Sequence, residues 1–242
     1  MATDAELDLF RVESAITQGE LKITGRLVDA SNATLLASVE DAGSEITCIY
    51  KPIAGEKPLW DFSTGTLAHR EYAAYLLSSM GKFDVVPFTI LRDGPYGRGM
   101  VQRWIDIDKT LDMLEFFQKD DPALRNIALF DAVINNTDRK IGHLLPDLHG
   151  RVLGCDHGVT FHSQDKLRTV LWQWAGLPLS DWEISRLRDL EKLLGKSLGK
   201  ELLPLLSAEE LTALDTRLSK ILSSGSFPIP SNEWPSVPWP PF

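Results

Sequence analysis

The chain changes character at about residues 102–108, and this change constrains the fold more than any other feature of the sequence. Before it, short apolar runs alternate with polar turns, which is typical of antiparallel strands. After it, apolar residues recur at helical spacing. The sequence therefore predicts an α+β protein with a β-rich part and one helix in residues 1–103 and a mainly helical part in residues 104–226. Residues 227–242 form a third segment, a tail rich in Pro and Trp.

The β-rich part divides into short elements at turn residues. Residues 19–52 predict three antiparallel strands, and residues 68–80 predict a helix that ends at Gly81. Two further strands are expected over Val85–Leu91 and Met100–Ile105. The apolar spacing of residues 7–18 fits a helix or a strand, and both remain open.

The helical part carries clear start signals. Asp121 followed by Pro122 predicts a capped helix, and serines three residues before a Glu, at Ser180 and Ser207, each predict a capping box. Short strands are expected at Leu144–Leu145 and Val152–Leu153. The tail holds six of the 14 prolines and two of the seven Trp residues. It is therefore expected to be extended and to pack onto the domain through its Trp side chains.

Composition excludes several classes of function. The 34 Asp and Glu residues outnumber the 25 Lys and Arg residues, which gives a net charge of −9, and a nucleic-acid partner is not expected for so acidic a chain. Two cysteines cannot build a disulfide framework. The N-terminus lacks the pattern of a signal peptide, and no apolar run reaches the ~20 residues that span a bilayer. We expect a cytoplasmic protein without a transmembrane segment, and the oligomeric state is left open.

The first candidate site combines Lys51 and Glu71. Lys51 ends an apolar strand just before Pro52, where its ammonium group can face a phosphate. Glu71 lies on the helix that follows and would hold this ammonium group in place. A surface lysine is the simpler interpretation of Lys51 taken alone, and the carboxylate of Glu71 favours the pair.

The second candidate site combines two loop aspartates. Asp138 follows the helix that Asp121 caps, and Asp156 comes 18 residues later, after a short apolar strand. Phosphoryl transfer needs one carboxylate near the attacking oxygen and another that holds a divalent cation on the phosphates. Ordinary turn chemistry is the alternative, because Asp and Gly are common in turns.

In chain order these segments resemble the phosphatidylinositol 3- and 4-kinase superfamily. They are most similar to type II phosphatidylinositol 4-kinase-like proteins of actinobacteria, and more distantly to HipA-type kinases. The resemblance covers roughly residues 19–175. It is carried by Tyr50-Lys51-Pro52, His69-Arg70-Glu71, Val86-Pro87, Val101-Gln102-Arg103-Trp104, Asn136-Thr137-Asp138-Arg139 and Asp156-His157-Gly158.

The resemblance implies a two-lobed protein-kinase-like fold and an ATP-dependent kinase that uses Mg²⁺ or Mn²⁺ and binds ATP between its lobes. By position, Lys51 would bind the phosphates and serve catalysis, and Glu71 would anchor it. Asp138 would be the catalytic aspartate, and Asp156 would bind the metal together with His143. The nucleotide would also contact Ser31 in the phosphate-covering loop and, through a hinge, Val101, Gln102 and Arg103.

Two departures from the family pattern leave the function open. His143 stands where the family usually has a metal-binding Asn, although Mg²⁺ prefers oxygen ligands. The chain also lacks a basic amphipathic face, so a kinase-like architecture is better supported than a lipid substrate. The phosphoryl acceptor is left open among a protein, a lipid and a small molecule. A nucleotide-binding pseudokinase or regulatory module is the main alternative. A zinc-dependent hydrolase is a distant one, and it would use a cluster formed by His143, His149, Cys155, His157 and His162.

Overall fold

The computed structural model describes residues 4–27 and 32–242, with side chains from residue 9 onward. Contacts between Cα atoms divide the chain into two compact units. Unit 1 comprises Met1–Tyr72 and Pro87–Ile105, and unit 2 comprises Ala73–Val86 and Asp106–Phe242. The segment 73–86 was expected in the N-terminal part, and it groups instead with unit 2. Each unit is described by itself.

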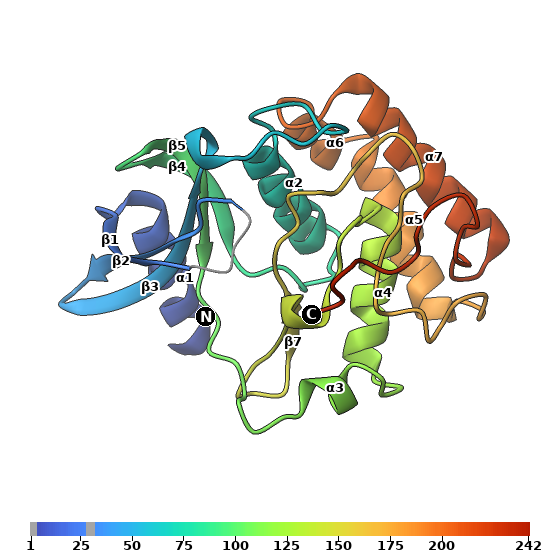
Figure 1. Ribbon diagram of the computed structural model, residues 1–242, viewed down its shortest axis with the longest axis horizontal. Helices are drawn as coiled ribbons and strands as arrows, with labels where there is room; N and C mark the ends of the chain where they lie inside the picture. The colour runs from blue at the N-terminus through green and yellow to red at the C-terminus, as the bar shows by residue number, and fades with distance from the viewer. Residues whose placement is uncertain (1–3, 28–31) are drawn as a thin grey trace. The chain divides into compact units, whose positions relative to one another are not determined.

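Unit 1 is built on a five-stranded sheet in which all neighbouring strands are antiparallel. The strand order is β1-β2-β3-β5-β4 (Figure 1). The three strands expected within residues 19–52 are present. The strands are β1 (Lys22–Arg26), β2 (Leu35–Asp41), β3 (Ser44–Pro52), β4 (Thr89–Gly94) and β5 (Gly97–Arg103).

The segment that the sequence left open is a helix, α1 (Asp4–Gln18). Its Ile16 packs into a buried apolar cluster with side chains of the sheet, including Cys48, Tyr50 and Val101. Burial raises the pKa of Cys48 to about 11, so this thiol behaves as a small apolar residue at neutral pH. A short 3₁₀ helix, η1 (Ile53–Gly55), follows β3.

Helix α2 (Leu67–Met80) begins in unit 1 and ends in unit 2. Its first amides, those of Leu67 and Ala68, donate hydrogen bonds to the carboxylate of Glu56. A negative charge at this end is favourable, because the first N–H groups of a helix have no partner within the helix. Glu56 therefore fixes the start of the helix that carries Glu71.

The strand expected over Val85–Leu91 begins later, at Thr89. The backbone amides of Val85 and Val86 donate to the hydroxyl oxygen of Ser78 on α2, at 2.9 and 3.1 Å. Because a side chain takes the hydrogen bonds that a strand partner would take, these residues form a buried connection in unit 2.

Unit 2 is mainly helical, and its apolar core surrounds α4, whose residues from Ile127 to Ile134 are all buried. Asp121 caps α4, and the capping boxes of Ser180 and Ser207 are both formed, as expected. Helices α5 and α7 pack side by side (Figure 1). The helices are α3 (Met113–Phe116), α4 (Pro122–Ile134), α5 (Asp181–Leu194), α6 (Ser197–Leu202) and α7 (Ala208–Ser224).

A small hairpin in unit 2 positions the two aspartate loops. It consists of β6 (Leu144–Pro146) and β7 (Val152–Gly154). Residues 135–143, the Asp138 loop, connect α4 to β6 and include the 3₁₀ helix η2 (Ile141–His143). Residues 155–158, the Asp156 loop, follow β7 directly.

The tail, residues 227–242, contains neither helix nor strand, in agreement with its proline content. Trp234 is half-buried, with its ring 4.8 Å from the ammonium group of Lys166. Trp239 is 85% exposed, so the expectation that both Trp side chains pack onto the domain is wrong for this one. In the described ranges, no helix combines the length and the apolar character needed to cross a membrane.

Candidate functional site

In unit 1, the side chains of Lys51 and Glu71 form an ion pair. The distance from Lys51 Nζ to Glu71 Oε1 is 2.6 Å, as the order of strand and helix led us to expect. The Glu71 side chain is 2% exposed and that of Lys51 is 19% exposed. A buried carboxylate therefore holds an ammonium group that remains partly open to solvent.

The end of β3 is held close to β5 by the absence of a side chain at Gly99. Gly99 lies opposite Pro52 in the register of the two strands. A Cβ atom at Gly99 would meet the Cα of Pro52 at 2.7 Å and the ring of Tyr50 at 2.8 Å. Because real Cβ atoms do not approach so closely, only glycine allows the backbone on both sides of Lys51 to lie where it does.

The residues expected to form an adenine-binding hinge lie inside the sheet. Val101 and Gln102 pair with β3 on one side and with β4 on the other. Arg103 pairs with Cys48, and its amide donates to the carbonyl of Phe88 at 2.9 Å. The backbone of Val101 and Gln102 therefore has strand partners on both sides, which leaves no open edge for a base at these two residues. The contact expected at Arg103 stays a prediction. Ser31, expected to contact the phosphates, lies outside the described residues.

In unit 2, Asn135 and Asn136 tie the Asp138 loop to the end of α4. Asn135 ends the helix in a left-handed conformation, with φ at 53°, and its side-chain amide donates to the carbonyl oxygens of His162 and Gln164. Asn136 donates to Asp131 on α4 at 2.9 Å and accepts from the backbone amide of Asp138 at 3.0 Å. The main chain at Asp138 is thus connected to a buried helix.

The carboxylate of Asp138 is 33% exposed and lies 3.6 Å from Lys140 Nζ. Burial raises the pKa of Asp138, the positive charge of Lys140 opposes this shift, and the negative charge of Asp156 adds to it. A carboxylate with a raised pKa that remains accessible is suited to accept a proton. Asp138 and Asp156 are thus electrostatically coupled within unit 2.

Asp156 lies in the left-handed region, with φ at 60°, and its side chain is 46% exposed. His143 Nε2 is 3.5 Å from Asp156 Oδ2. The backbone amide of Lys140 donates to Nδ1 of the same imidazole at 3.4 Å, which assigns the ring proton to Nε2. An imidazole in this tautomer has its N–H on the side of the Asp156 carboxylate, a geometry that fits a positioning role for His143. The expected role of His143 as a metal ligand stays a prediction.

The donor atoms at Asp156 suit a cation that arrives with phosphates. Within residues 4–27 and 32–242, no three or more His, Cys, Asp and Glu side chains gather closely enough to hold a metal ion. Mg²⁺ is often held by one or two carboxylates together with water and substrate phosphates, and Asp156 fits this pattern. The zinc hydrolase considered from the sequence has no ligand set in this part of the chain.

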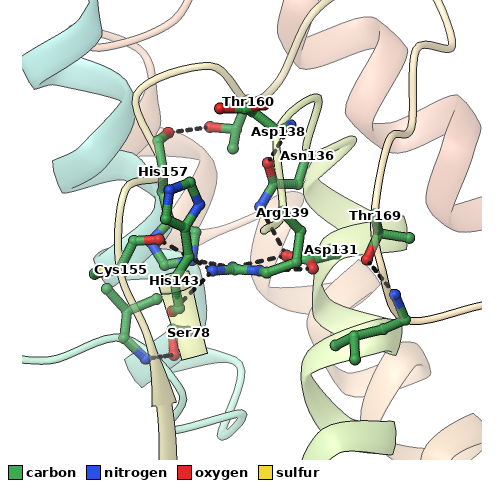
Figure 2. A network of polar contacts seen from close by, with 12 residues as sticks. Ser78, Asp131, Asn136, Asp138, Arg139, His143, Cys155, His157, Thr160 and Thr169 are labelled. Atoms are coloured by element: carbon green, nitrogen blue, oxygen red, sulfur yellow. Dashed lines mark hydrogen bonds and ion pairs between the residues drawn. The ribbon is translucent and has the colours of Figure 1, made fainter. Parts of the chain in front are cut away.

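A buried network joins the two aspartate loops, and sequence reasoning missed it (Figure 2). Arg139, which is fully buried, donates from Nε and Nη2 to the carboxylate of Asp131, at 2.9 Å each. Its Nη1 donates to the carbonyl oxygen of Cys155 at 3.0 Å, and its Nη2 is 2.7 Å from Nε2 of His157. The guanidinium group of Arg139 thus contacts the residues on both sides of Asp156. Arg139 itself directly follows Asp138 in the chain.

The electrostatics of this network hold Arg139 in its charged form. Burial alone would lower the pKa of Arg139, but the charge and hydrogen bonds of Asp131, together with the negative charges of Cys155 and Asp156, outweigh burial and the pKa is raised. Gly154 leaves room for the guanidinium group, because a Cβ there would lie 3.0 Å from Nη1. The signal that reveals the network is Asp131 itself, an acidic residue inside an otherwise apolar stretch of helix.

Comparisons with known proteins show which fold this chain shares and which sequence it is related to. No protein-family model matches the sequence. A proinflammatory kinase of Helicobacter pylori, CtkA, has a similar structure, with a TM-score of 0.50 at 12% sequence identity, and the match covers 86% of this chain and 93% of that one. This likeness confirms the expected α+β, kinase-like fold with a β-rich N-terminal part and a helical C-terminal part.

A sequence relative covers nearly the whole chain. "Protein Rv2133c" of Mycobacterium tuberculosis is 38% identical in an alignment of 264 positions, gaps included, that covers 95% of each protein. This chain has a kinase-like fold. It belongs to the same family as Rv2133c.

Proposed function

We propose that the protein is an ATP-dependent phosphotransferase of the phosphatidylinositol 3- and 4-kinase-like type. The observation that carries the proposal is the 2.6 Å ion pair between Lys51 on β3 and Glu71 on α2. In protein kinases, a strand lysine held by a helix glutamate positions the nucleotide phosphates, and the pair must be formed for activity. The kinase-like fold and the two accessible carboxylates of unit 2 support the same function.

Each residue has a role that its surroundings suit. Lys51 binds phosphate oxygens, and the buried Glu71 keeps its ammonium group in one position. Asp138 orients the acceptor hydroxyl and accepts its proton as the terminal phosphoryl group passes from ADP oxygen to acceptor oxygen. Asp156 would hold Mg²⁺ or Mn²⁺, and His143 would orient the carboxylate of Asp156. When bound, this cation neutralises charge on the phosphates.

The acceptor is a hydroxyl group of a protein, a lipid or a small molecule. A nucleotide-binding module without transfer activity is the second candidate, because an imidazole faces Asp156 where kinases of this type place an amide. Turnover of ATP separates the two candidates. The reduced thiols of Cys48 and Cys155 support a cytoplasmic location, because reducing compartments keep cysteines in this form.

ATP together with Mg²⁺ or Mn²⁺ should raise the melting temperature of the protein. Ligand at about 100 times its Kd stabilises the folded state by about 2.7 kcal/mol. We expect Lys51→Met to lose most of this shift and Lys57→Met, a change at an exposed lysine, to keep it. Differential scanning fluorimetry measures both. A folded wild-type protein that shows no shift at millimolar ATP would contradict the proposal.

Replacing His143 with Asn should leave metal preference nearly unchanged. If His143 only orients Asp156, the carboxylate and the phosphate oxygens set the choice of metal in both proteins. The ratio of ATP affinities with Mn²⁺ and with Mg²⁺, measured by titration calorimetry, should then change by less than about twofold. A shift of about tenfold towards Mg²⁺ would instead show that the imidazole is a metal ligand.

A further inference from the structure

The segment that supports the Asp138 loop lies between this loop and the tail. Residues 166–170, here called the support segment, form a ladder of backbone hydrogen bonds with the loop. The Arg168 amide donates to the Asn136 carbonyl at 2.9 Å, and the Arg139 amide donates to the Arg168 carbonyl at 3.0 Å. The amide of Val170 then donates to the Arg139 carbonyl at 3.2 Å. The position of the Asp138 loop therefore depends on the support segment.

The tail binds the support segment mainly through backbone carbonyls. The carbonyl oxygen of Ser236 accepts from the amide of Thr169 at 3.0 Å and from the indole Nε1 of Trp172 at 2.8 Å. The ring of Trp234 packs under the ammonium group of Lys166 at 4.8 Å. Thr169 and Lys166 are both buried, so these contacts lie away from solvent.

The tail also reaches the Asp138 loop directly. The carbonyl oxygen of Pro241 accepts a hydrogen bond from the amide of Ile141 at 2.9 Å, and the Ile141 side chain belongs to the buried core. Ile141 lies between Asp138 and His143 in the chain. The side chains of Asp138 and Asp156 nevertheless remain 33% and 46% exposed. The tail therefore contacts the backbone of the loop and leaves the carboxylates of Asp138 and Asp156 accessible to solvent.

We infer that residues 232–242 are a positioning element for the Asp138 loop. This inference rests on the proposed function, because it assigns the tail a part in placing the proposed catalytic aspartate. Without the tail, the amides of Thr169 and Ile141 and the indole of Trp172 lose their carbonyl partners. The loop then samples more conformations, and a misplaced catalytic group lowers the rate of transfer, while Lys51 in unit 1 keeps its contact with the nucleotide.

Two nested truncations and one substitution test the inference. A chain that ends at Ser231 removes all the tail contacts described above and keeps the buried Phe227. A chain that ends at Val237 removes the Pro241 contact and keeps Ser236. Trp172→Phe removes the indole donor from a full-length chain, which guards against truncations that fail to fold. Hydrogen exchange at single amides, the rate of transfer at saturating ATP and the Kd for ATP are measured for all three.

We expect exchange at Ile141 to become at least about tenfold faster in both truncations, and exchange at Thr169 to do so only in the shorter chain. Amides of strand β3 should keep their protection. The transfer rate should fall by about tenfold or more in the shorter chain, with the Kd for ATP measured without a divalent cation unchanged, and Trp172→Phe should show a smaller change in the same direction.

The outcomes separate this inference from the proposed function. Protection retained at Ile141 and Thr169 in the truncated chains would overturn the inference whether or not the protein is a kinase. Faster exchange at these amides with an unchanged transfer rate would overturn the positioning role. Faster exchange in a protein that shows no transfer in any form would support the structural contact and count against the proposed function.

Discussion

Replacing Asp138 with Asn is expected to lower phosphoryl transfer by about 10²- to 10⁴-fold, the usual contribution of a general base. The Asn side chain has nearly the same shape, and the hydrogen bond from the Asp138 amide to Asn136 involves only the backbone of this residue. Binding of ATP should therefore be unchanged. Transfer from labelled ATP and titration calorimetry measure the two effects on the same protein.

A second aspartate variant sharpens this prediction. Asp156→Ala should lose the part of ATP binding that depends on the divalent cation, because it removes the carboxylate proposed to hold it. Asp215→Asn is the matched control, since Asp215 is an exposed residue of α7. Equal loss of ATP binding in the Asp138 and Asp156 variants would show that the two roles are assigned wrongly.

Replacing Arg139 with Met is expected to destabilise unit 2 by about 3–5 kcal/mol, the usual cost of removing one partner of a buried ion pair. The carboxylate of Asp131 is fully buried and would lose the guanidinium group that pairs with it. The carbonyl of Cys155 would lose its donor at the same time. Urea unfolding followed by the helical circular dichroism signal measures the effect, because α4 to α7 all belong to unit 2.

Two controls show whether the buried charge is the cause. The double variant Asp131→Leu with Arg139→Met should recover part of the lost stability, because it removes both charges together. Lys192→Met breaks an exposed ion pair with Asp189 and should leave the unfolding midpoint unchanged. A loss below about 1 kcal/mol for Arg139→Met would contradict a structural role for the buried pair.

Local signals in the sequence predicted the elements whose causes are themselves local. The caps at Asp121, Ser180 and Ser207 depend on a side chain and on amides two or three residues away, so their spacing alone reveals them. The contact between Lys51 and Glu71 was also within reach, because a strand followed by a helix brings these positions together.

Features that depend on distant partners were not predictable in this way. Val85 and Val86 have β-branched side chains typical of strands, but their backbone amides donate hydrogen bonds to the Ser78 hydroxyl instead of to a neighbouring strand. The hinge contacts expected at Val101 and Gln102 are contradicted because β4 pairs with the second edge of β5, and strand order cannot be read from apolar alternation. The absence of a helix in the tail was correctly expected, yet the partners of its carbonyls come from segments that only the folded chain brings near.

The most direct test of the proposed function is transfer of the labelled terminal phosphate of ATP to a cell lysate and to lipid extracts, with Mg²⁺ and with Mn²⁺. We expect the wild-type protein to label an acceptor and the Asp138→Asn and Lys51→Met variants to leave it unlabelled. Folded wild-type protein can instead bind ATP but neither label any acceptor nor consume ATP with either metal. This result would contradict the proposal that the protein is a kinase and would favour a nucleotide-binding module without transfer activity.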